Sequence, residues 1–88
     1  MIPSSLIPLL RAWIETLVYL ETCDESVVDP DVAVKLIEGM MGPVIDLPNE
    51  DLLALISVAR EMHDMPGRSI ESREALNEII DMLQNASG

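Results

Sequence analysis

Apolar residues recur along this chain every three or four positions, which is the spacing of an α-helix with one buried side. The pattern predicts four helices, at about residues 5–21, 30–41, 48–65 and 70–84. No stretch shows the alternation of apolar and polar residues that is typical of a β-strand. The predicted fold class is therefore all-α, a compact bundle-like domain of four helices that occupies residues 1–88.

The core is expected to be aliphatic, because the chain has no Phe, one Trp and one Tyr. The buried side of the second helix is predicted to comprise Val32, Ala33, Leu36, Ile37, Met40 and Met41. The corresponding residues of the last two helices are Leu52, Leu55, Ile56, Ala59 and Met62, then Leu76, Ile79, Ile80 and Leu83. The connector before the third helix is expected to tuck Val44, Ile45 and Leu47 under the domain.

The first helix has an unusually wide apolar surface. One stripe comprises Leu6, Leu9, Leu10, Trp13, Leu17 and Leu20. The surface is widened to most of the circumference by Ile7, Ile14, Val18 and Tyr19. A helix that is apolar on nearly every side must be covered on several sides. We therefore expect a dimer, or a bound partner, to cover part of this helix.

The second helix has clear start and stop signals. Asp29 is placed to cap it, Pro30 suits its first position, and Asp31 suits the positive end of the helix dipole. Gly42 and Pro43 are expected to end it.

The chain is strongly acidic, with sixteen Asp and Glu, five Lys and Arg, and a net charge of −11. Such a surface repels nucleic acid and anionic membranes and attracts cationic partners. Cys23 is alone, which favours a reducing compartment. The apolar N-terminal stretch is interrupted by Pro8, Arg11 and Glu15, so it predicts neither a signal peptide nor a membrane span. We expect a cytoplasmic protein.

One concentration of carboxylates surrounds the approach to the second helix. No Lys or Arg lies between Ala12 and Val34, but six acids do, namely Glu15, Glu21, Asp24, Glu25, Asp29 and Asp31. Capping explains Asp29 and Asp31, whereas Glu21, Asp24 and Glu25 follow a helix C-terminus, where negative charge opposes the dipole. The predicted partner-binding residues are Glu21, Asp24, Glu25, Asp29 and Asp31. The alternative is a loop that is merely solvated.

A second acidic feature lies on the fourth helix. Within about 80° on a helical wheel, opposite the apolar side, are Glu71, Glu74, Glu78 and Asp81. This stripe is predicted as a secondary binding surface on a different face from the first set. The alternative is the exposed back of an ordinary helix.

No motif indicates catalysis, a metal or a cofactor. His63 with Glu61 and Asp64 is a poor ligand set, because adjacent residues on a helix diverge and no second His is present. Cys23 and His63 have no accompanying motif for an oxyanion site. The methionines are expected to fill the core, the alternative being an adaptable docking surface. We predict a protein without enzymatic activity, metal or cofactor.

Two families share some of these features. The segment "DESVV" resembles the approach to the modified Ser of acyl carrier proteins, but Glu25 precedes Ser26 and the helix starts three residues later. In size, acidity and helical organisation, with acids around the approach to the second helix, the whole chain resembles bacterial immunity proteins, including the partners of nuclease colicins. The paired anchor tyrosines of the colicin partners have no counterpart, since Tyr19 lies in the first helix.

The resemblance implies an immunity-type inhibitor that neutralises a basic toxin by occluding its site. Independently, the charge and the lack of catalytic motifs favour a non-enzymatic module that binds a basic protein. The alternative function is a homodimeric helical structural or regulatory module, with the first helix as the interface. Neither a nucleic acid nor a membrane is an expected partner.

Overall fold

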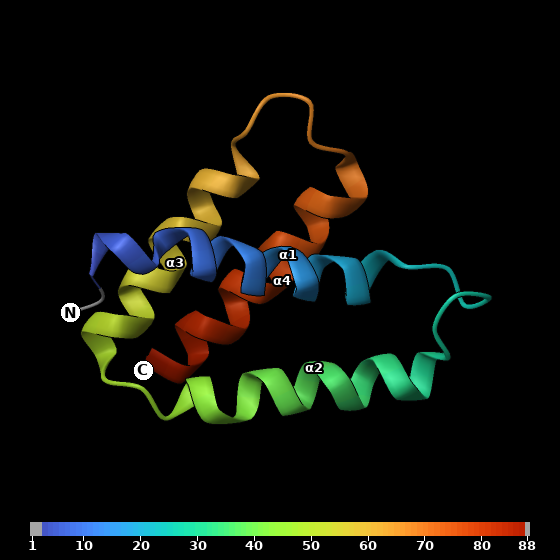
Figure 1. Cartoon of the computed structure of the whole chain (residues 1–88), viewed down its shortest axis with the longest axis horizontal. Helices are drawn as coiled ribbons and strands as arrows, with labels where there is room; N and C mark the ends of the chain where they lie inside the picture. The colour runs from blue at the N-terminus through green and yellow to red at the C-terminus, as the bar shows by residue number, and fades with distance from the viewer. Residues whose placement is uncertain (1–2, 88) are drawn as a thin grey trace.

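The computed structural model describes residues 3–87 and has four α-helices (Figure 1). They are α1 (Ile7–Thr22), α2 (Pro30–Ile45), α3 (Asn49–His63) and α4 (Ile70–Ser87). A short 3₁₀ helix at Ser4–Leu6 leads into α1. Within the described residues no strand is present, so the all-α, four-helix prediction is confirmed.

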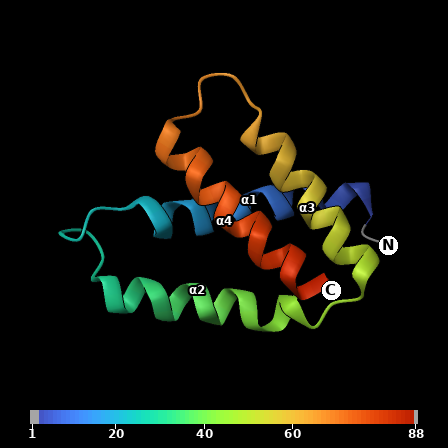
Figure 2. The same cartoon turned by 180° about the vertical axis from the view of Figure 1, so that it is seen from behind.

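The helices form two antiparallel pairs. α3 and α4 make a hairpin whose loop stands at the top of Figure 1, and Gly67 in that loop has a φ of +83°, which favours glycine. α1 crosses this hairpin and contacts both of its helices. α2 lies along the edge of the molecule, antiparallel to α1, as the reverse view also shows (Figure 2). It contacts mainly α1 and, less extensively, α4.

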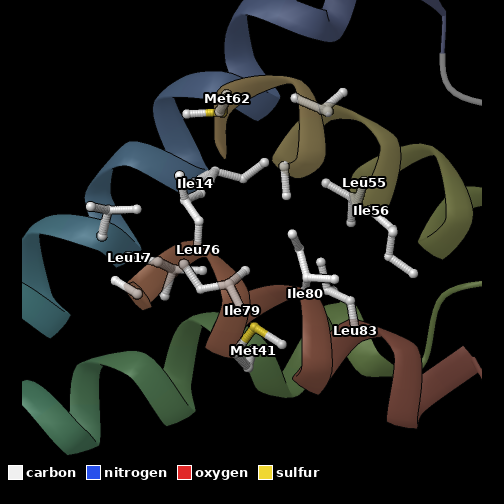
Figure 3. Packing of buried hydrophobic residues seen from close by; sticks show 14 of the residues in the cluster. Ile14, Leu17, Met41, Leu55, Ile56, Met62, Leu76, Ile79, Ile80 and Leu83 are labelled. Atoms are coloured by element: carbon white, nitrogen blue, oxygen red, sulfur yellow. The ribbon is translucent and has the colours of Figure 1, made fainter. Parts of the chain in front are cut away.

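The core lies where α1, α3 and α4 meet (Figure 3). Ile14 and Leu17 of α1 are fully buried against the hairpin, as predicted for an apolar α1. All the residues that the sequence placed in the core from α3 and α4 are buried. The same helices also bury Val58, Ser72 and Ala75.

The prediction for the buried side of α2 is partly wrong. Only Ala33 and Met41 are buried in this helix, and Met41 reaches the core beside Ile79 (Figure 3). Val32 and Leu36 are each 48% exposed. The physical reason is that α2 lies at the edge of the molecule. Its neighbours cover only one side of the helix, and its apolar residues extend beyond that side. The same holds for Ile45, which is 46% exposed rather than tucked under the domain.

The end of α2 also differs from the prediction, because the helix runs through Gly42 and Pro43 to Ile45. Gly42 does not adopt a positive φ and therefore does not act as a helix stop. Pro43 removes only one backbone donor, and the last turn is closed by the amide of Leu47, which donates to the carbonyl of Val44 at 3.0 Å. The α3 helix ends two residues early, at His63, and α4 continues to Ser87.

Candidate functional site

Two of the predicted partner-binding carboxylates have local structural roles. The N–H of Asp31 donates to Oδ1 of Asp29 at 2.9 Å, so Asp29 caps α2 as predicted. The N–H of Ser26 donates to Oδ1 of Asp24 at 2.9 Å and lowers the pKa of Asp24. Asp24 is therefore explained by the turn that it makes after α1, a role that was not predicted for it from the sequence.

Glu21 instead joins the acidic stripe of α4. An open pocket of about 290 Å³ lies where the last turn of α1 meets the first half of α4. We call it the acidic pocket, and its lining residues are Glu21, Thr22, Glu71, Glu74, Ala75 and Glu78. The two predicted acidic sets thus meet here, which contradicts the expectation that they occupy different faces. Asp81, the fourth member of the stripe, is exposed outside the pocket.

The surroundings of Glu21 disfavour the charged form of its carboxyl. Partial burial, a hydrogen bond shared with Glu78 and repulsion by the Glu78 carboxylate raise the pKa of Glu21 to about 7 from the ordinary value of 4.5. Two carboxyls can share a hydrogen bond only if one of them holds a proton. At neutral pH the pair therefore holds a proton for part of the time, because no Lys or Arg lines the pocket to neutralise it.

Basic residues neutralise a different part of α1. Arg68, in the loop between α3 and α4, donates to Oε1 of Glu15 and is 13% exposed in its side chain. Arg11 and Glu61 form a more open pair, with 3.8 Å between Nη2 and Oε2. The negative charge of Glu15 is thus compensated on the side of α1 that faces the hairpin loop. The charges of the acidic pocket have no comparable compensation among its lining residues.

A second hollow involves the remaining acid of the predicted set, Glu25. This groove, of about 280 Å³, lies between the end of α1, the loop at residues 23–29 and the first half of α2. We call it the α1–α2 groove, and it is lined by Leu20, Glu21, Cys23, Glu25, Val28, Pro30, Ala33, Val34 and Ile37. Glu21 borders both hollows, so the groove and the acidic pocket are adjacent. Asp29 and Asp31 are exposed but line neither.

Two apolar residues that line this groove, Val28 and Val34, were not predicted from the sequence. Val28 follows Val27 in a loop that is largely polar, and Val34 is 53% exposed on α2. An apolar residue in a polar loop is a signal that the sequence contains. Its pairing with Val34 across a groove depends on how α1 and α2 are arranged.

A third hollow, of about 270 Å³, is almost entirely apolar and lies at the start of α1. Its lining residues come from α1, α2, α3 and the connector before α3, and they are Leu9, Leu10, Trp13, Val44, Leu47 and Leu55. Leu9 is 64% exposed and Leu6, one turn away, is 43% exposed. The wide apolar surface of α1 is therefore left partly uncovered by the other helices.

His63 and Cys23, considered above as a metal ligand and a nucleophile, each make a contact within their own segment of the chain. His63 pairs with its neighbour Asp64, with 3.0 Å between Nδ1 and Oδ1. Cys23 is a free thiol whose Sγ donates to the carbonyl of Leu20. Among residues 3–87, no three His, Cys, Asp or Glu side chains are arranged to hold a metal ion, including the carboxylates of the acidic pocket. None of the described helices is long and apolar enough to cross a membrane.

Comparison of the chain with models of protein families, with characterised proteins and with solved structures found no match. The acidic pocket, the α1–α2 groove and the apolar hollow therefore carry the structural evidence on function.

Proposed function

We propose that this protein is a non-enzymatic, acidic protein-binding module, and specifically an immunity-type inhibitor that neutralises a basic toxin by occluding its site. A cytoplasmic location is part of the proposal, because the lone thiol of Cys23 suits a reducing compartment. The proposal requires no catalytic residue, metal or cofactor of this chain.

One observation supports the proposal most directly. Carboxylates from α1 and α4 converge on the acidic pocket, where no basic residue lines the walls. Partial burial, together with the hydrogen bond and repulsion from Glu78, disfavours the charged form of Glu21 and raises its pKa to about 7. A cationic side chain of a partner would relieve the repulsion between Glu21 and Glu78 and favour the charged form of Glu21. Unfavourable crowding that a partner relieves is a reasonable mark of a binding surface.

The physical logic extends to the rate of binding. A toxin that cuts nucleic acid or binds a nucleotide needs a basic cleft, and a chain of net charge −11 is attracted to such a cleft from a distance. Electrostatic steering raises association rates by about 10- to 1000-fold at low salt. Fast capture matters for an inhibitor, because the toxin must be bound before it acts.

The test starts from the reading frames that flank the gene, since inhibitors of this kind are usually encoded beside their toxins. Each flanking frame is expressed in bacteria alone and together with this chain. The proposal predicts that one frame stops growth alone, that co-expression restores growth, and that the purified pair forms a complex that weakens with salt. If neither flanking product is toxic or binds the chain, an immunity-type function is wrong.

The same complex tests the acidic pocket. We expect Glu74→Gln to slow association several-fold, because it removes a charge that lines the pocket. Asp81→Asn is the matched control, since it removes one charge from the same helix outside the pocket. Equal effects of the two substitutions would mean that only the net charge matters.

A homodimeric helical module is the second candidate, and the uncovered apolar start of α1 favours it. Leu9, which lines the third hollow, is 64% exposed, whereas Ile14 and Leu17 of the same helix are fully buried. Light scattering should then give about twice the 9.7 kDa of one chain. Leu9→Gln should shift the protein to a monomer, whereas Leu53→Gln, at a similarly exposed position on α3, should not. A monomer at all concentrations would reject this candidate.

A further inference from the structure

From the shape and charge of the α1–α2 groove, we propose that it receives an amphipathic helix of a basic partner, with an apolar side chain in the groove and Lys or Arg beside Glu21 and Glu25. This inference rests on the proposed function, because it assigns the contact by which the basic partner is recognised. It places the specific contact in the groove and leaves the acidic pocket as the neighbouring source of attraction.

The floor and walls of the groove are apolar but lie open to solvent. Leu20 and Ala33 form buried parts of the lining, while Val28 and Ile37 are half-buried and Val34 is 53% exposed. This openness follows from the position of α2, whose first half lies against α1 and away from the hairpin (Figures 1 and 2). An apolar recess of this kind gains free energy when another apolar side chain fills it.

The acidic residues around the groove favour a partner with positive charge. Glu21 and Glu25 are part of the lining, Asp24 and Asp29 are exposed in the adjoining loop, and no Lys or Arg lines the groove. An apolar recess with an acidic rim complements a segment that combines apolar and basic side chains. Acidic peptides, nucleic acids and anionic lipids would meet like charge here.

The size of the groove and the all-helical fold favour a helical segment of the partner. At about 280 Å³ the open groove has room for a few side chains. The described residues contain no strand, so they offer no sheet edge to which an extended peptide could add. An amphipathic helix presents its apolar and basic side chains on defined faces and therefore suits an apolar recess with an acidic rim.

The first test uses a fluorescein-labelled 18-residue peptide of Leu and Lys, patterned as an amphipathic helix, and measures its binding by fluorescence anisotropy. A peptide of the same composition, shuffled so that no apolar face remains, is the control. We expect the patterned peptide to bind at least five-fold more tightly than the shuffled one. Equal binding would show that charge alone attracts the peptide and would overturn the groove proposal.

Matched variants locate the contact. Val34→Asn should weaken the patterned peptide about five-fold, because it places an amide in the groove, whereas Val32→Asn on the same helix should change binding less than two-fold. Glu25→Gln should likewise weaken binding more than Glu38→Gln, which removes an exposed charge of α2 outside the groove. All four positions are exposed, and an unchanged circular dichroism spectrum would verify that each variant folds.

Amide chemical shifts separate failure of this inference from failure of the proposed function. The inference predicts that the peptide shifts amides of residues 20–37 most strongly. Shifts centred on residues 71–78, or equal losses in groove and control variants, would overturn the groove contact while leaving an acidic binding module in place. If the patterned peptide and both flanking gene products all fail to bind, both proposals are wrong.

Discussion

The α3–α4 hairpin and α2 differ in how many of their apolar residues are buried. In the hairpin, each helix directs its apolar stripe onto its neighbour and onto α1, and those side chains are almost completely buried. The α2 helix has a higher apolar content along its length but buries only Ala33 and Met41. Its exposed apolar residues include Val32, Val34 and Leu36. The hairpin is therefore a core, whereas α2 is an edge whose surface remains available.

This difference indicates where stability and binding are separated in the molecule. The hairpin supplies most of the packing that holds the fold together, so its residues have little freedom to change. The edge helix can present apolar side chains at a small cost in stability, because they contribute little to the core. Both candidate binding surfaces proposed for a basic partner border the end of α1, next to this edge.

The largest expected effect contrasts a leucine of each region. Leu76→Ala in α4 should lower the free energy of unfolding by about 3 kcal/mol, because the side chain is fully buried and leaves a cavity. Leu36→Ala in α2 should cost less than about 0.5 kcal/mol, since that side chain is 48% exposed. Urea denaturation followed by circular dichroism measures both. Similar losses would remove the distinction between core and edge.

Hydrogen exchange should show the same contrast in the unmodified protein. Amides in the middle of α3 and α4 should exchange at least ten-fold more slowly than those in the first half of α2, a difference of about 1.4 kcal/mol in opening free energy. The reason is that α2 is packed mainly against a single helix, α1, and that its first half lies away from the hairpin (Figures 1 and 2). Uniform protection along α2, α3 and α4 would show that the four helices open as one unit.

Loss of the cap should weaken α2 selectively. Asp29→Ala should lower stability by about 1 kcal/mol, because the N–H of Asp31 loses its acceptor. Exchange should accelerate in the first turn of α2 and not in the hairpin. Asp31→Ala is the control, because it removes a charge from the same turn and keeps the cap, and it should cost less. Equal costs would mean that charge, rather than the capping hydrogen bond, is responsible.

The last expected effect, no larger than loss of the cap, concerns the contact between α1 and α4 at Glu21. Because its pKa is raised to about 7 in the folded protein, the folded state binds more protons between about pH 4.5 and pH 7. Stability should therefore fall as the pH rises through that interval. A shift of this size in a fully buried group would be worth about 3 kcal/mol. Solvent reaches the open pocket and screens the charges, so we expect about 1 kcal/mol.

Comparison of variants isolates this effect from the other carboxyls. Urea denaturation between pH 5 and pH 8 should show a smaller pH dependence for Glu21→Gln than for the unmodified protein. Glu25→Gln should retain the full dependence, since Glu25 is exposed in the loop and does not line the acidic pocket. If both variants behave like the unmodified protein, Glu21 does not share a proton with Glu78.

Local features of the sequence were sufficient to predict the four helices and most of the core. Helical periodicity depends on residues three and four apart, so the buried stripes of α3 and α4 could be assigned without knowing their neighbours. The cap at Asp29 is equally local, because its acceptor and donor are two residues apart. The prediction that α2 ends at Gly42 and Pro43 was wrong, because these residues permit a helix end without requiring one.

The sequence by itself determined the helical class, the start of α2, the acidic charge and the set of carboxylates from which a binding surface could be built. Only the tertiary structure decided that Glu21 of α1 lies beside Glu78 of α4 rather than with Asp24, because that depends on where two helices cross. It also decided that Val32 and Leu36 stay exposed. Periodicity shows that a helix has an apolar side, but how much of that side is covered depends on the number and placement of its neighbours.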